Sequence, residues 1–410
     1  MPPPGAQFAS FNNGYPPPNG GHYAYPGPGV TNAQPIPHQP MQHASVGTLK
    51  KGVGYFGQDR IVTTWVDQDE AEAFDKTPLE RFAQNALEDS TFRVDYLFMQ
   101  LPRPGYTTLG AQIPGIKKPY EPFTIGGGTA EVLTTGQIEL TDVSGIQGTF
   151  TTPLTFATFE FSAFLMEQAS DTGTVPNLVS GGSHFAVTPV TVNHASTFLL
   201  PAVYDTSYTA HYTSDIWGGR ANAIINYPMP GEGVELRPLF GARFVRVHDH
   251  MLQEGVSTNA GGFSSHISSD AINNVYGPNA GFTLELDHRS FTIGVRPELM
   301  VGVNHYRNRV ETETVLGPTD PRSGDELDET DFAAVGELAL YGKVRLNDYI
   351  SLYAAYTNLW LFRVQRADDI INYDTVGVGG IAVASNFQVQ QSSRDMRIHG
   401  ITVGGVITWK

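Results

Sequence analysis

Residues 331–347, DFAAVGELALYGKVRLN, decide the fold, because their hydrophobicity alternates with a period of two. The even-numbered residues are all apolar or glycine, and the odd-numbered ones include Glu337, Lys343 and Arg345. Successive side chains of a β-strand point to opposite faces, so this segment predicts a strand with one apolar and one charged face. Such a strand fits an outer-membrane barrel, with lipid outside and polar groups inside. It also fits a soluble barrel, so the alternation alone does not decide between them.

Nine further segments of the chain show the same alternation of hydrophobicity. The ten segments span residues 91–101, 137–149, 155–166, 204–228, 233–250, 271–288, 290–310, 331–347, 349–364 and 395–409. Their connections alternate in length, with short ones near 151–153, 228–233, 287–290 and 347–348, and long ones at 102–136, 167–203, 251–270, 311–330 and 366–394. Tight turns at one end and long loops at the other are typical of barrels in outer membranes.

We therefore predict an all-β fold, a transmembrane up-and-down antiparallel β-barrel of about ten strands over residues 91–410. Two further strands hidden in 102–136 or 167–203 would make it a twelve-stranded barrel, which is the second possibility.

Composition limits the other classes of protein. The chain has 410 residues and a formal charge of −16, and contains no Cys. The acidic balance argues against nucleic-acid binding, and the absence of Cys excludes disulfides and a thiol nucleophile. No apolar run reaches the length of about 18 residues that a transmembrane helix needs. The chain starts Met1-Pro2-Pro3-Pro4 without the features of a signal peptide, so we expect that a signal peptide has been removed.

The N-terminal region differs from the rest. Residues 1–45 are rich in Pro, Gly, Asn, Gln and Tyr, and we predict a disordered tail that is a spacer or contacts a cell-wall or envelope partner. Residues 46–90 are predicted to be a periplasmic linker with a short helix within 67–88, which Pro78 breaks or restarts.

The alternation also predicts which charged side chains face the lumen. Seven are basic and seven acidic: Arg93, Asp95, Glu160, Arg220, Glu235, Arg237, Arg243, Glu285, Asp287, Arg296, Glu298, Glu337, Lys343 and Arg345. We expect them to pair, because unpaired ions in a narrow lumen are costly. Ten strands lies near the size at which side chains fill a barrel, so we expect a plugged or very narrow lumen.

Two features could bind metal. His248 and His250 lie on the same side of a strand end, and residues 320–331 hold six acidic side chains. The acidic run lacks the ordered spacing of a calcium loop, and a polar strand end explains the histidines equally well. We predict no metal site and no cofactor.

Barrel proteases with Asp/His pairs above the rim suggest an enzymatic alternative. His211 with Asp215, or Asp249 with His250, could mimic such a pair. Neither lies in a recognisable catalytic motif. We therefore predict no catalytic residue and no enzyme activity.

The terminal segment carries a pattern of its own. Thr402, Gly404, Ile407 and Trp409 resemble the assembly signal of outer-membrane barrels, although the aromatic residue is here followed by Lys410.

Several ordered stretches together resemble a family, the β-barrel porins of planctomycete outer membranes. They are FRVDYL at 92–97, WGGRAN at 217–222 with LRPLFGARF at 236–244, VYGPNAGF at 275–282 with FTIGVRP at 291–297, and ISLYAAYTNLW at 350–360 followed by ADDI at 367–370. The resemblance covers about 91–410 and implies an outer-membrane location. It supplies no catalytic residues.

We therefore expect a non-enzymatic outer-membrane barrel, either a narrow porin-like channel or a structural envelope barrel with long surface loops. A surface adhesin or interaction barrel is the alternative, and a hydrolase with a site at the rim is less favoured. The expected partners are outer-membrane lipid and lipopolysaccharide, the barrel-assembly machinery, and an envelope partner of the N-terminal tail.

Overall fold

The chain divides into two units, residues 1–75 and 76–410. The computed structural model describes residues 55–57 and 60–62 of the first unit, and 90–112, 122–125, 127–154, 156–193, 200–226, 233–258, 261–375, 377–378, 381–382 and 384–409 of the second. In the first unit, β1 (Tyr55–Gly57) pairs with β2 (Arg60–Val62). The predicted tail at 1–45 and the predicted helix within 67–88 lie outside the described residues.

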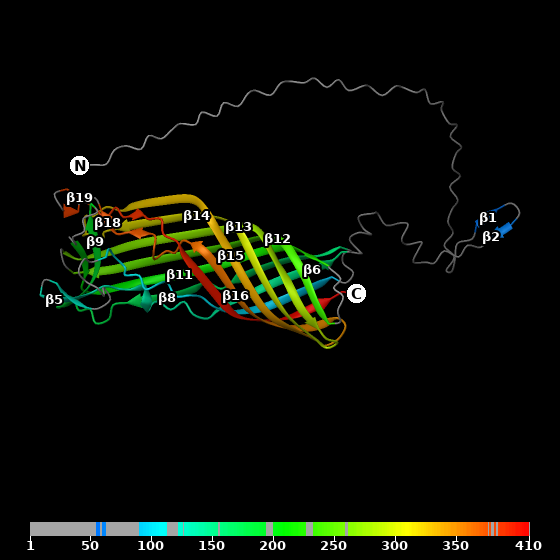
Figure 1. Ribbon diagram of the computed structural model, residues 1–410. Coiled ribbons are helices and arrows are strands. Elements are labelled where there is room, and N and C mark those ends of the chain that lie inside the picture. Colours follow the sequence, from blue (N-terminus) through cyan, green and yellow to red (C-terminus); the bar gives the residue numbers. More distant parts are fainter. Residues whose placement is uncertain are drawn as a thin grey trace, which may run out of the picture. The chain divides into compact units, whose positions relative to one another are not determined.

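Ten antiparallel strands of the second unit form a closed ring (Figure 1). In ring order they are β3 (Thr91–Gln100), β6 (Val143–Pro153), β7 (Ala157–Met166), β11 (Ser207–Ile225), β12 (Val234–Ser257), β13 (Phe263–Asp287), β14 (Phe291–Glu313), β15 (Ser323–Arg345), β16 (Ile350–Val364) and β22 (Arg394–Thr408). The last strand pairs with the first through β22 and β3, and β11 pairs with β12. The prediction of a ten-stranded antiparallel barrel is confirmed.

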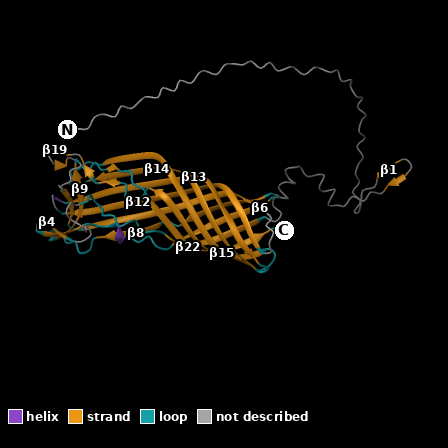
Figure 2. Cartoon of the chain, in the orientation of Figure 1, coloured by secondary structure: helices purple, strands orange, loops and turns teal. Residues whose placement is uncertain are grey.

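The regions that could have hidden two more ring strands hold other structure. β8 (Ala169–Thr174) continues the line of β7 along β11. A separate sheet contains β4 (Phe123–Ile125), β5 (Gly128–Glu131), β9 (His184–Val192), β10 (Leu200–Tyr204) and β18 (Asp374–Thr375). The remaining short elements are the 3-10 helix η1 (Thr135–Gln137) and the pairs β17 (Ile371–Asn372) with β21 (Gln388–Val389) and β19 (Gly377–Val378) with β20 (Ile381–Ala382). Most of the unit is therefore strand, with loops gathered at one end (Figure 2). Among the residues that the structure describes, no helix is long and apolar enough to cross a membrane.

Four ring strands are longer than the sequence predicted. β12 to β15 contain 24, 25, 23 and 23 residues. The expected long connections at 251–270 and 311–330 are mostly strand, so that β12 ends at Ser257 and β13 begins at Phe263. At about 3.3 Å per residue, these strands are roughly 80 Å long. The prediction was wrong here because the outward side chains turn polar while the strand continues.

That change on the outer face marks the membrane-spanning part. Along β12 the outward residues are apolar from 234 to 244, and Arg246, His248 and His250 follow. Along β13 the apolar outward stretch runs from 286 back to 276. A transmembrane strand needs about 9–11 residues, which matches both stretches. The remaining length of each strand extends beyond the membrane toward the end with the long loops, here called the loop end; the opposite end is the turn end.

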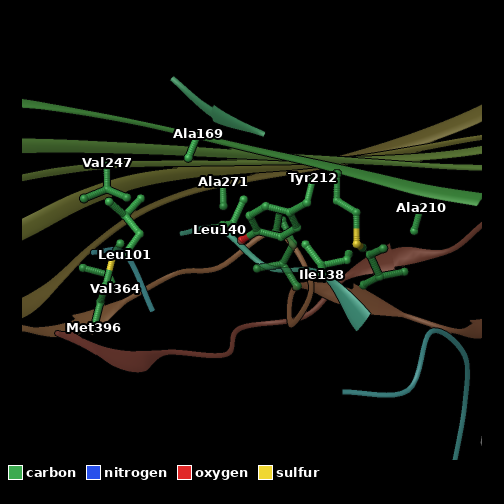
Figure 3. Close-up of a cluster of buried hydrophobic side chains, with 14 of the residues drawn as sticks. Leu101, Ile138, Leu140, Ala169, Ala210, Tyr212, Val247, Ala271, Val364 and Met396 are labelled. Carbon is green, nitrogen blue, oxygen red and sulfur yellow. The ribbon is translucent and has the colours of Figure 1, made fainter. Parts of the chain in front are cut away.

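A hydrophobic core fills the ring in its loop-end half. Figure 3 shows Tyr212 of β11, Val247 of β12 and Ala271 of β13 packed against side chains from the connections, among them Leu101 and Ile138. These five side chains are buried. The core of this barrel therefore lies inside the ring of strands, and the loops supply part of it.

Candidate functional site: the barrel lumen

Six charged side chains meet in the middle of the lumen. This lumen hexad consists of Glu160, Arg220, Arg243, Arg296, Glu298 and Glu337. They come from β7, β11, β12, β14 and β15, and none of their side chains is more than 10% exposed. With three Arg and three Glu, the lumen hexad has no net charge.

The hexad is held by shared ion pairs. Arg296 donates from Nη1 and Nη2 to the two carboxylate oxygens of Glu160 at 2.7 and 2.6 Å. Arg220 Nη1 lies 2.8 Å from Glu337 Oε1 and 3.2 Å from Glu298 Oε1. Arg243 Nη2 donates to the second oxygen of Glu337. Each carboxylate of the hexad thus contacts two guanidinium groups, and Glu160 also forms a bidentate pair with Arg296, as expected for strong buried pairs.

The register of the strands explains why these pairs cross the lumen. Arg220 of β11 stands directly opposite Arg243 of β12, and Glu298 of β14 directly opposite Glu337 of β15. Like charges in directly opposite positions destabilise a sheet. Between the two pairs lies β13, whose Asn279 donates to Glu298 Oε2 at 2.6 Å. The two like-charged pairs therefore neutralise each other across the concave inner surface.

The other predicted lumen charges lie nearer the turn end. Arg93 Nε pairs with Asp95 at 2.7 Å, and Arg345 Nη2 with Asp287 at 2.6 Å. Arg237 pairs with Glu285 and lies 3.7 Å from Glu235.

Lys343 is the exception among the fourteen predicted residues. Among the described residues, no carboxylate lies within ion-pairing distance of its ammonium group. Its direct neighbour on β16 is Tyr353, whose ring lies 4.0 Å below the Arg93 guanidinium.

A cavity of about 400 Å³, here called the turn-end well, runs from the turn end to the hexad and past it along β7, as far as Met166. Its rim is formed at the strand ends by Glu235 and Arg345, whose side chains are 58% and 41% exposed. Its inner end is formed by hexad members and by apolar residues such as Leu97 and Leu359.

On β12, β14 and β15, the inward side chains become apolar directly beyond the hexad. The next inward residues toward the loop end are Val245 after Arg243, Met300 after Glu298 and Val335 after Glu337. All three are fully buried in the hydrophobic core. On these three strands the lumen therefore changes from charged to apolar within one layer of side chains.

One connection crosses the lumen above that layer. The crossing loop joins β16 to β22, which lie across the ring from β12 and β13, and its described residues are 365–375, 377–378, 381–382 and 384–393. Gln365 N donates to Asn273 Oδ1 of β13 at 2.7 Å, and Ser269 Oγ of β13 donates to the carbonyl of Ala367 at 2.8 Å.

A buried ion pair fixes the same loop to β12. Arg366 pairs with Asp249, whose Oδ2 also accepts a 2.7 Å hydrogen bond from the hydroxyl of Tyr212. The side chains of Arg366 and Asp249 are 4% and 0% exposed. Arg366 was not predicted from the sequence, because a loop has no periodicity that could show where its side chains point. The only sequence feature that drew attention to this segment was the adjacent ADDI stretch.

The candidate metal site is an outward pair of histidines on one aspartate. Asp270 Oδ1 lies 3.0 Å from His250 Nδ1 and 3.4 Å from His248 Nε2. The hydrogen bond with Asp270 raises the pKa of His250 above its ordinary value. In the described part of the chain, no group of three or more potential metal ligands comes together.

The two candidate dyads are not assembled. Asp249 faces the lumen and His250 faces outward, because they are neighbours on one strand. His211 contacts Thr172 at 2.9 Å, and within the described ranges no hydrogen bond joins it to Asp215.

The acidic run at 320–331 fastens loops and neighbouring side chains. Asp320 accepts from Ser385 N at 2.9 Å, and Asp325 accepts from Val389 N at 2.8 Å. Glu326 pairs with Arg307 at 2.6 Å.

The predicted assembly-signal residues lie on β22 and just after it. Thr402 is buried on the lumen side, whereas Ile407 and Trp409 are exposed on the outer side. Gly404 lies where β22 closes the ring against β3, and a Cβ there would overlap the carbonyl oxygen of Val94.

Two solved structures are similar to this chain over most of its length. The outer membrane protease OmpT from Escherichia coli is 9% identical, with a TM-score of 0.37, over 79% of this chain and 97% of that one. The toluene transporter TodX from P. putida is 10% identical, with a TM-score of 0.20, over 78% of this chain and 89% of that one. The curated proteins contain no match to the sequence.

A family model described as Putative beta barrel porin-7 (BBP7) matches residues 92–409, which is nearly all of the ring of strands and its connections. This match, together with the closed ring and its apolar outer band, supports an outer-membrane location. The chain belongs to this family of β-barrel porins.

Proposed function

We propose that this chain is a closed, non-enzymatic barrel of the bacterial outer membrane, and that it holds surface loops in place instead of acting as an open diffusion channel. The observation that carries the proposal is the crossing loop, whose Arg366 reaches Asp249 on the far side of the ring. A planctomycete outer membrane is the location that the sequence resemblance implies.

Energetics support a permanently seated loop. Removing one partner of a buried ion pair costs about 3–5 kcal/mol, because the other charge stays buried and unpaired. Withdrawing the crossing loop would separate Arg366 from Asp249 and also expose apolar core residues such as Ile370 and Phe387. Thermal fluctuations should therefore open the lumen only rarely.

The long strands support a role in display. Beyond the membrane-spanning part, the outer faces of β13 and β14 carry polar residues such as Asp270 and Arg307. This extension holds the loops away from the membrane surface, where lipopolysaccharide or another envelope partner could contact them. A surface interaction role is consistent with this arrangement.

Planar bilayer recording tests the proposal. We expect purified, folded protein to insert without producing discrete conductance steps. Heat-dependent mobility on an SDS gel would verify that the barrel is folded. Stable, reproducible steps from the wild-type protein would overturn the closed-barrel proposal and favour a narrow channel.

A further inference from the structure

The turn-end well has the features of a ligand site that the closed-barrel proposal does not use. Its volume of about 400 Å³ lies within the range of small-molecule sites, which is about 300–1,000 Å³. Hexad members line its wall, apolar residues such as Met99 and Met166 line its inner end, and its rim lies at the turn end. A ligand would therefore enter and leave from one side, which in an outer-membrane barrel is the periplasm.

The unsatisfied polar atoms of the well are all of one kind. Three buried nitrogens on its lining residues make no hydrogen bond: Arg243 Nη1, and Arg220 Nε and Arg237 Nε, which instead lie 3.5 and 3.7 Å from carboxylate oxygens of Glu160 and Glu235. Every one is an N–H donor, and Arg243 is buried with its side chain only 4% exposed. These nitrogens are shielded from the cavity, so the donor that the well offers to a ligand is the ammonium group of Lys343, which lines it.

Lys343 adds an unpaired cation to the same wall. Its ammonium group lines the well without a carboxylate partner in the described residues, next to the Tyr353 side chain on β16. The Tyr341 and Tyr353 rings lie 5.8 Å apart, which gives this wall an aromatic surface beside the cation. Such a wall suits a planar organic group that carries a negative charge.

The charges around the well favour a ligand with a single negative charge. Seven cationic and five anionic side chains line the well. Asp95 and Glu298 lie just behind the lining and balance the two extra cations through ion pairs with Arg93, Arg220 and Arg296. The carboxylates around the well repel a doubly charged ligand, whereas a single negative charge can pair with Lys343. We propose that the turn-end well binds a small organic acid with a single carboxylate, held by Lys343.

Calorimetric titration of the detergent-folded full chain with benzoate tests this proposal. We expect saturable binding of one benzoate per chain, at least tenfold weaker in Lys343→Met and little changed in Lys343→Arg, which keeps the cation. Arg309→Met is the matched control, because Arg309 lies on the outer face of β14 with its side chain 52% exposed. It should bind benzoate as the wild type does.

Three results would overturn the proposal: no binding of benzoate, equal binding by wild type and Lys343→Met, or tighter binding of inorganic phosphate than of benzoate. If Lys343→Met does not fold, the wild type alone still decides. Benzoate should then protect Lys343 from an amine-reactive ester, as read by peptide mass spectrometry, and unprotected labelling would contradict the site. None of these outcomes affects the bilayer test, since a closed barrel needs no ligand.

Discussion

The two halves of the lumen are filled in different ways. In the turn-end half, the ring is lined by charged side chains that pair with one another and leave a cavity of about 400 Å³. In the loop-end half, apolar side chains of the ring pack against the loops and leave a hydrophobic core. The strands alone can line a lumen, but in this chain the loops are needed to fill one.

The largest expected effect comes from breaking the ion pair that fixes the loop in the filled half. Asp249→Leu should lower the free energy of unfolding by about 4 kcal/mol, because Arg366 stays buried without a partner. The double variant Asp249→Leu/Arg366→Met should recover most of that loss. Denaturant unfolding in detergent, followed by tryptophan fluorescence, measures both. Equal losses in the single and double variants would mean that the pair is not buried as described.

A smaller loss is expected in the charged half. Arg220→Met should cost about 2–3 kcal/mol, because Glu298 keeps Arg296 and Glu337 keeps Arg243 as a partner, and Glu337 lines the well, where water can reach it. The same unfolding measurement applies. A loss larger than that of Asp249→Leu would reverse the comparison between the two halves.

The sequence predicts features that repeat within one strand, but not the register between strands or the path of a loop. The inward position of a residue such as Arg296 follows from the alternation within one strand. The opposition of Arg220 to Arg243 depends on the register between two strands, which no pattern within either strand specifies. The crossing loop was not predicted either, because an aperiodic segment gives no direction for its side chains. The lengths of β12 to β15 were underestimated because their outer faces become polar above the membrane.

The smallest expected effect lies outside the lumen, at His250. Its pKa is raised by Asp270, so the protonated pair stabilises the fold below the unfolded pKa of about 6.5 and this contribution is lost as pH rises through the folded value. Because both side chains are about one third exposed, the contribution should stay below about 1 kcal/mol.

NMR titration of histidine ring signals checks this prediction. The His250 signal should titrate above the ordinary range in the wild type and return to it in Asp270→Asn. A His250 pKa that is unchanged by Asp270→Asn would refute the assigned contact.

The most direct test of the account asks whether the crossing loop lies inside the ring. The chain has no Cys, so Ser269→Cys with Ala367→Cys creates a single possible disulfide between the lumen side of β13 and the loop. We predict that this pair cross-links in the folded barrel, and that Ser268→Cys with Ala367→Cys does not, because Ser268 lies on the outer face. Failure of the Ser269 pair to cross-link, with both cysteines open to a water-soluble maleimide, would contradict a lumen closed by this loop.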